Sequence, residues 1–223
     1  MEYLSSGDSF LAIEYLGRQT DALAVVKTYD KLLKQLYYEK RDITAVIRMG
    51  RAGIQHGLTS AATAGNDTAL AKGLKDRART VAYNLASYTW PGWDEPGIKL
   101  DPSQIAQGLD AAAVAVRLSA ELGQDALHQS RGYWMLAAHQ VAAGDLPGAA
   151  GNFKNAAELA RTAQAPGEAL LSEGFAALTG LLASPNDAAA EARFVDVKRR
   201  LANEKDGRFF IEQLDTARRV FGK

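Results

Sequence analysis

Cysteine is absent from the sequence, which excludes disulfide bridges, thiolate metal sites and cysteine nucleophiles. An excess of charge is absent as well, because 26 Lys and Arg residues balance 26 Asp and Glu residues. Proteins that bind nucleic acid or acidic membranes usually carry a net basic surface. We therefore expect no nucleic-acid partner and no membrane partner.

Long apolar runs are also missing. No stretch of the sequence approaches the ~18 apolar residues that are needed to span a bilayer. Residues 1–10 lack the basic segment followed by an apolar run that marks a secretory signal. We therefore expect a cytoplasmic protein.

Proline is scarce, and its six copies punctuate the chain, whereas alanine is frequent. Alanine is the best helix former and proline interrupts helices, so the composition favours an all-α fold. Apolar residues recur every three or four positions in a series of segments, which predicts amphipathic helices. The predicted helices are 8–16, 20–38, 42–57, 67–88, 102–122, about 124–143, 145–164, 166–182, a helix after Asp187, and 208–221, with residues 59–66 as a turn.

Residues 132–164 form the clearest unit, a helical hairpin. Gly144 can adopt the left-handed conformation that ends a helix, and Asp145 can accept hydrogen bonds from the free amides that open the next one. Pro147 then stands near the first helical position, where its missing N–H is no loss. One face of the first helix holds Tyr133, Leu136, Ala137 and Gln140, and one face of the second holds Ala149, Phe153 and Ala156.

This order of residues resembles the tetratricopeptide repeat, a helix-turn-helix unit of about 34 residues. The match is partial, because Gln140 stands where the family usually has an aromatic residue and Arg161 where it usually has the closing proline. The alternative is an ordinary helical bundle. The small-large signature of the second helix recurs elsewhere, at Ala112, Val116 and Ser119 and again at Ala190, Phe194 and Val197.

The resemblance implies a right-handed α-solenoid of antiparallel helix hairpins, with about nine or ten helices in a single domain over residues 1–223. The helix 208–221 is then expected to cap the stack, because terminal repeats need a polar outer face.

Gly50, Gly53 and Gly57 recur along the predicted helix 42–57. Each interior glycine destabilises a helix by about 1 kcal/mol relative to alanine, so a row of them needs a reason. We favour close packing of a neighbouring helix over space for a ligand.

The segment 87–101 is the one irregular stretch, and it contains two of the three tryptophans. Long loops in compact helical domains are usually functional or packed back on the fold. Two interpretations stay open: Tyr88, Trp90 and Trp93 form a binding surface, or they fill space between helices.

Little in the sequence indicates catalysis. His128 and His139 are separated by roughly 16 Å along one helix, which is too far to share a metal ion. His56 has no carboxylate three or four residues later, and phosphate-binding loops and serine-hydrolase motifs are absent. We therefore expect no catalytic residue, no metal and no cofactor.

The favoured function is a non-catalytic scaffold that binds another protein or a peptide in the groove of the array. If the resemblance holds, Arg131 and Gln140 face this groove, and Tyr88, Trp90 and Trp93 are the second set of candidate partner-binding residues. One alternative is an enzyme or small-molecule binder whose pocket is closed by the 87–101 loop, with Asp94, Glu95 and a histidine. Another is an architectural homodimer.

Overall fold

The computed structural model describes residues 8–222 of the chain, and this part is all-helical. It contains ten α-helices and no strand, which confirms the predicted all-α class for the described residues. The helices are α2 (Ser9–Gly17), α3 (Ala22–Gln35), α4 (Ile43–Ala62), α5 (Thr68–Tyr88), α6 (Pro102–Glu121), α7 (Ala126–Ala143), α8 (Leu146–Thr162), α9 (Pro166–Ala183), α10 (Ala188–Leu201) and α11 (Gly207–Phe221), with a π-helical segment η1 (Leu36–Lys40) and a 3-10 segment η2 (Pro91–Trp93).

Aspartate begins most of these helices. In eight of them its carboxylate accepts hydrogen bonds from backbone amides of the first turn, which satisfies donors that the helix itself leaves free. The exceptions are α9, which begins after Ala165, and α11, which begins after Asp206 without a side-chain cap. The capping residues are Asp8, Asp21, Asp42, Asp67, Asp101, Asp125, Asp145 and Asp187.

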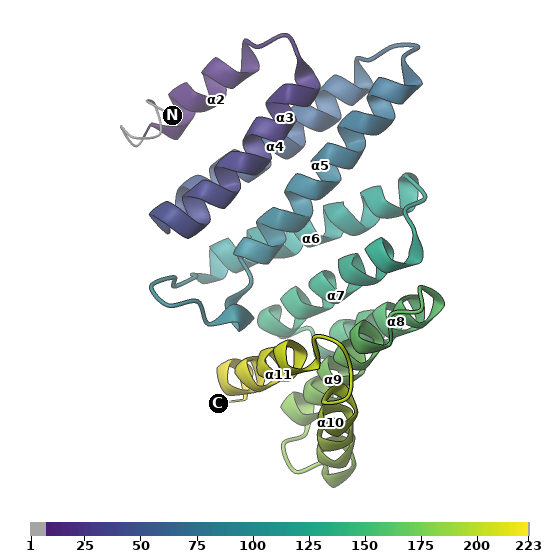
Figure 1. The fold of residues 1–223 in the computed structure, drawn as a ribbon. Coiled ribbons are helices and arrows are strands. Elements are labelled where there is room, and N and C mark those ends of the chain that lie inside the picture. Colours follow the sequence, from purple (N-terminus) through teal and green to yellow (C-terminus); the bar gives the residue numbers. More distant parts are fainter. Residues whose placement is uncertain (1–7, 223) are drawn as a thin grey trace.

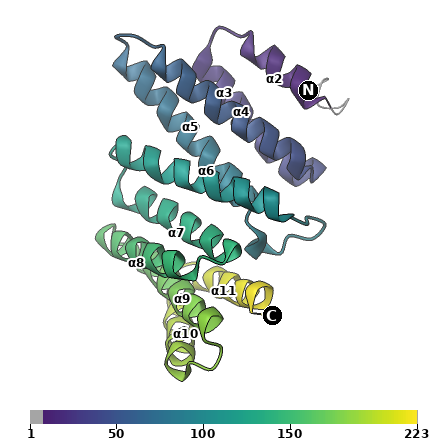
Figure 2. The ribbon, with the colours of Figure 1, turned by 180° about the vertical axis from the view of Figure 1, so that it is seen from behind.

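From α3 to α10, each helix packs against the next one in the chain. Helices α3, α5 and α7 lie on the side that faces the viewer in Figure 1, and α4, α6 and α8 lie on the opposite side, as Figure 2 shows. The pair α9 and α10 is turned relative to these layers. The three copies of the small-large signature fall on α6, α8 and α10, which are alternate members of the series.

The glycine row of α4 is explained by helix packing, as predicted. A β-carbon added at Gly50 would lie 2.8 Å from the Leu85 side chain, and one at Gly53 would lie 2.8 Å from the β-carbon of Tyr29. Only hydrogen fits between α4 and its neighbours at these positions, because both distances are shorter than van der Waals contact.

The predicted end of the helix 42–57 was wrong. Helix α4 continues to Ala62, so the first half of the predicted turn 59–66 is helical and only residues 63–66 form a turn. Residues of turn composition remain helical here because α4 stays packed along α5 beyond Gly57, whose added β-carbon would meet Ala78.

The last helix, α11, does not simply extend the stack beyond α10. It turns back along α9 and reaches η2, more than a hundred residues earlier in the chain. In Figure 1 it lies in front of α9 and beside the loop that follows α5. The C-terminal helix therefore lies on the same side of the protein as α5 and α7.

Candidate functional site: the aromatic groove

Two adjoining hollows, of about 530 and 380 Å³, lie between α5, η2, α7, α9 and α11. Both are lined by Ser87, Trp93, Phe209 and Gln213, so together they form one continuous depression, which we call the aromatic groove. The larger hollow is further lined by Tyr83, Ser130, Arg131, Trp134, Glu168, Leu171, Ser172, Asp206 and Phe210. The smaller one is further lined by Tyr37, Tyr38, Tyr88, Gly92, Glu95, Glu212 and Thr216.

Trp90 lies beneath this groove, in the core. Its side chain is 2% exposed, and its indole N–H donates to the backbone carbonyl of Ala138 over 3.0 Å. The ring packs edge-on against Trp93 and Trp134, with centroid distances of 4.6 and 5.4 Å. Of the two interpretations of the 87–101 loop, Trp90 therefore follows the packed one, because a side chain so deeply buried offers no surface to a partner.

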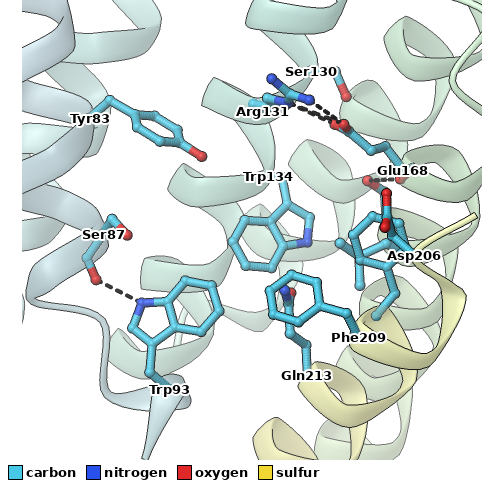
Figure 3. A pocket seen from close by; sticks show the side chains of 13 residues that line it. Tyr83, Ser87, Trp93, Ser130, Arg131, Trp134, Glu168, Asp206, Phe209 and Gln213 are labelled. Atoms are coloured by element: carbon cyan, nitrogen blue, oxygen red, sulfur yellow. Dashed lines mark hydrogen bonds and ion pairs between the residues drawn. The ribbon is translucent and has the colours of Figure 1, made fainter. Parts of the chain in front are cut away.

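Trp93 lies three residues later and has a different environment. It is half-buried and lines both hollows. Its indole N–H donates to the backbone carbonyl of Ser87 over 2.8 Å, which satisfies an acceptor in the last turn of α5. This bond fixes the ring, while one part of it stays available in the groove (Figure 3).

Tyr88 lines the smaller hollow. Its ring stacks on Tyr37 with a centroid distance of 4.4 Å, and Tyr38 packs edge-on against it. Burial raises the pKa of Tyr88 to about 12, so its hydroxyl is neutral and can donate a hydrogen bond at physiological pH. The 87–101 segment thus contributes two of its three aromatic candidates to the groove.

Arg131 lies at the end of the larger hollow, where α7 meets α9. It forms a bidentate pair with Glu168, with Nε–Oε2 and Nη2–Oε1 distances of 3.0 and 2.5 Å. Hydrogen bonding to Glu168 raises the pKa of Arg131 above its usual value. Tyr83 stands beside this pair in Figure 3, and burial raises the pKa of its hydroxyl. This end of the groove is polar, and Asp206 adds a further carboxylate beside the pair (Figure 3).

Trp134 forms the middle of the larger hollow (Figure 3). Its side chain is 7% exposed, and its indole Nε1 is buried without a hydrogen-bond partner among the described residues. An unpaired buried donor is destabilising by about 1–3 kcal/mol, so native structures rarely contain one without a reason. Because the nitrogen itself is fully buried, an acceptor on a partner can reach this donor only after a neighbouring element of the groove moves.

Gln140, the remaining predicted residue, is not part of the groove. Its side-chain amide donates to the carboxylate of Asp145 over 2.9 Å, and its oxygen accepts from Asn152 over 2.7 Å. These bonds tie the α7–α8 turn together. The structure therefore brings Tyr88, Trp93 and Arg131 together, and places Gln140 at the other end of α7.

The carboxylates of the loop face arginines. Glu95 accepts from Arg41 over 3.1 Å, and Asp94 accepts from Arg219 over 2.8 Å. Arg41 also donates to the backbone carbonyl of Pro96. These bonds anchor the loop to the end of η1 and to α11.

The histidines lie apart from these carboxylates and from the groove lining. His139 is buried and donates from Nε2 to the backbone carbonyl of Ala86 over 2.9 Å, and burial lowers its pKa to about 4. His128 pairs with Asp125 on the surface. His56 packs beside Tyr29, and burial lowers its pKa. Within residues 8–222, no three His, Asp or Glu side chains gather closely enough to hold a metal ion.

Sequence reasoning missed most residues of the groove, among them Tyr83, Trp134, Glu168 and Phe209. Trp134 could have been found, because it is the only tryptophan outside the 87–101 segment. Glu168 and Phe209 had no local signal, since their role depends on which helices meet.

Comparison with known proteins gave no match to a family model, to a curated protein or to a solved structure. None of the described helices is both long and apolar enough to cross a membrane.

Proposed function

We propose that this protein is a non-catalytic binding module that receives a segment of another protein in the aromatic groove. The observation that carries the proposal is the buried, unpaired indole N–H of Trp134 in a hollow lined by aromatic rings. Aromatic side chains provide much of the binding energy of protein interfaces, and a buried donor selects for an acceptor on the partner.

The scaffold around the groove supports this reading. Helix pairs that pack in sequence order, with small residues on alternate helices, fit a right-handed tetratricopeptide-like solenoid, and such arrays bind extended or helical peptides along the face of one helix layer. Helices α5, α7 and α9, which are alternate helices of the series, form part of the groove, and η1, η2 and α11 form the rest. On this proposal the protein acts in the cytoplasm and needs no cofactor.

The polar groups of the groove fit recognition better than catalysis. Its one close ion pair, Arg131 with Glu168, is mutually satisfied, and both groups are held in place by two hydrogen bonds. Asp94 and Glu95, the carboxylates considered for an enzyme pocket, are each paired with an arginine. A hollow lined by aromatic rings, with polar groups fixed at its ends, is suited to binding a peptide.

The test is site-specific photo-crosslinking followed by measurement of affinity. A photoreactive phenylalanine analogue at Tyr83 would capture the partner in the groove, and the same group at Ala113, exposed on α6, serves as the control. Capture at Tyr83 but not at Ala113 is the expected result. Equal capture at the two positions would contradict the proposal.

The captured partner is then titrated against purified variants. Trp93→Ala is expected to weaken binding by about 2 kcal/mol, roughly thirty-fold, because an aromatic anchor is lost. Gln140→Ala is the matched control, since it changes a groove-remote position on α7 and should leave the affinity unchanged. Equal affinities of wild type and Trp93→Ala would contradict the proposed site.

A further inference from the structure

Helix α11 already occupies one side of the aromatic groove. It buries Leu214 and Ala217 fully and packs its half-buried residues Phe210, Ile211 and Phe221 against the core. The opposite side of the helix is polar and exposed. An amphipathic helix is thus a ligand that this face accepts, because the chain's own last helix binds there.

The attachment of α11 depends mainly on its apolar stripe. It lacks a side-chain cap, and Asp206 before it has a left-handed backbone with φ of +60°. Its ion pairs with the rest of the protein are Arg218 with Glu191, Arg219 with Asp94 and Asp215 with Lys198, and all six side chains are at least partly exposed to solvent. Exposed pairs contribute little stability, so α11 is held mainly by its short apolar stripe.

The docking of α11 also leaves the groove incompletely filled. Phe209 is 57% exposed at the rim, although Trp93 and Trp134 lie across the hollow from it (Figure 3). The indole N–H of Trp134 has no acceptor from α11 or from any other described residue. A helix with an acceptor at this place would fit the same face better than α11 does.

The charges at the edge of the groove define the partner further. Asp94 in the loop and Glu191 on α10 lie where α11 presents Arg219 and Arg218. A helix that replaces α11 would therefore need basic residues near its C-terminal end. Acidic residues at these positions would face two carboxylates and weaken the complex.

We propose that α11 is an intramolecular occupant of the groove, displaced by a basic amphipathic helix of another protein that carries a hydrogen-bond acceptor for Trp134. This inference rests on the proposed function and names its partner class. A tethered helix competes at a high effective concentration, so the partner must gain from the acceptor and from filling the hollow. The protein thus exchanges a poor internal ligand for a better external one.

The experiment uses the full chain and a fluorescently labelled peptide with the sequence of residues 207–222. Leu214→Ala removes the central apolar contact of α11, and Ile47→Ala, a buried position on α4, is the matched control for general destabilisation. The peptide is expected to bind the Leu214→Ala protein at least tenfold more tightly than wild type or Ile47→Ala. Equal affinities for all three proteins, or no binding to any, would overturn the inference.

Peptide variants test the acceptor. A panel with glutamine at each inward position is measured on Leu214→Ala and on Leu214→Ala combined with Trp134→Phe. At one position, glutamine is expected to raise the affinity several-fold for the first protein and not for the second. A panel without such a position would overturn the role of the Trp134 donor.

Light scattering of the Leu214→Ala protein without peptide completes the test. A monomer at all concentrations is expected. A concentration-dependent dimer would mean that α11 of a second copy fills the groove and would overturn the external-helix proposal. None of these results depends on the crosslinking of a natural partner, so failure of this inference and failure of the proposed function can be told apart.

Discussion

Trp90 and Trp134 should respond differently to the same substitution by phenylalanine. Both rings are buried in one aromatic cluster, with centroids 5.4 Å apart, so the packing lost with the smaller ring is similar at the two positions. Their N–H groups differ, because that of Trp90 donates to Ala138 and that of Trp134 has no partner. The difference in the free energy of unfolding between the two variants therefore reports on the hydrogen bonding of the two indole N–H groups.

The expected difference follows from the energetics of hydrogen bonds. Trp90→Phe loses a bond whose net contribution is about 1 kcal/mol, whereas Trp134→Phe removes an unpaired donor that is destabilising by about 1–3 kcal/mol. With similar packing losses, Trp134→Phe should be more stable than Trp90→Phe by about 2 kcal/mol or more.

Urea unfolding followed by circular dichroism at the helical band measures this difference without relying on tryptophan emission. With a slope of about 1–3 kcal/mol per molar urea, the midpoint of Trp134→Phe should exceed that of Trp90→Phe by roughly 1 M. Equal midpoints, or a lower midpoint for Trp134→Phe, would refute the assignment of the unpaired donor and weaken the case for an acceptor on the partner.

Three further predictions concern the scaffold. Gly53→Ala should destabilise the protein by about 1–3 kcal/mol, because the added β-carbon would lie 2.8 Å from the Tyr29 side chain. Gly151→Ala on α8 should stabilise the protein by about 0.5–1 kcal/mol, because the added β-carbon would meet open space. Thermal or urea unfolding measures both changes. The pKa of His139 is lowered to about 4 in the folded protein, whereas in the unfolded chain it has its ordinary value near 6.5. Between these two pH values the unfolded chain binds more protons than the folded protein. The free energy of unfolding should therefore fall by about 3 kcal/mol as the pH decreases from about 6.5 to about 4. His139→Gln should reduce this loss in unfolding measured from pH 7 to 4, and His128→Gln, at the surface, should not; an unchanged pH dependence in His139→Gln would contradict the burial argument. Arg41→Ala should raise the rate of amide hydrogen exchange in the 94–98 segment about fivefold, which corresponds to ~1 kcal/mol, because the loop loses its bonds to Arg41. The exchange rates of α7 should not change. Equal exchange rates of the 94–98 segment in the variant and in wild type would show that this arginine does not anchor the loop.

Much of the fold could be predicted because its signals are local. The aspartates that begin eight helices, and Gly144 with its φ of +81°, act through hydrogen bonds and backbone preferences within a few residues. The glycine row of α4 was also interpreted correctly, since only close packing explains three glycines on one helix. The bounds of α4 were wrong because turn composition is a weak preference that contacts with α5 override.

The candidate site could be predicted only in part. Trp93 and Arg131 do lie in one hollow, but Trp90 is in the core although it stands three residues from Trp93. Both tryptophans stand in the same irregular segment, which has no periodicity that would separate a buried ring from a partly exposed one. Their difference comes from Ala138 and Phe175, which approach from other helices.

The sequence by itself determined that the chain forms helices, where most of them begin, and that its alternate helices share a small-large face. Only the tertiary structure decided that α11 turns back across α9 to the loop after α5, and that a donor on α7 is left unpaired beneath it. The physical reason is the distance along the sequence over which each kind of interaction acts. Helix periodicity and capping involve residues within about one turn of each other, whereas the groove depends on how whole helices cross and on where the last one comes to rest.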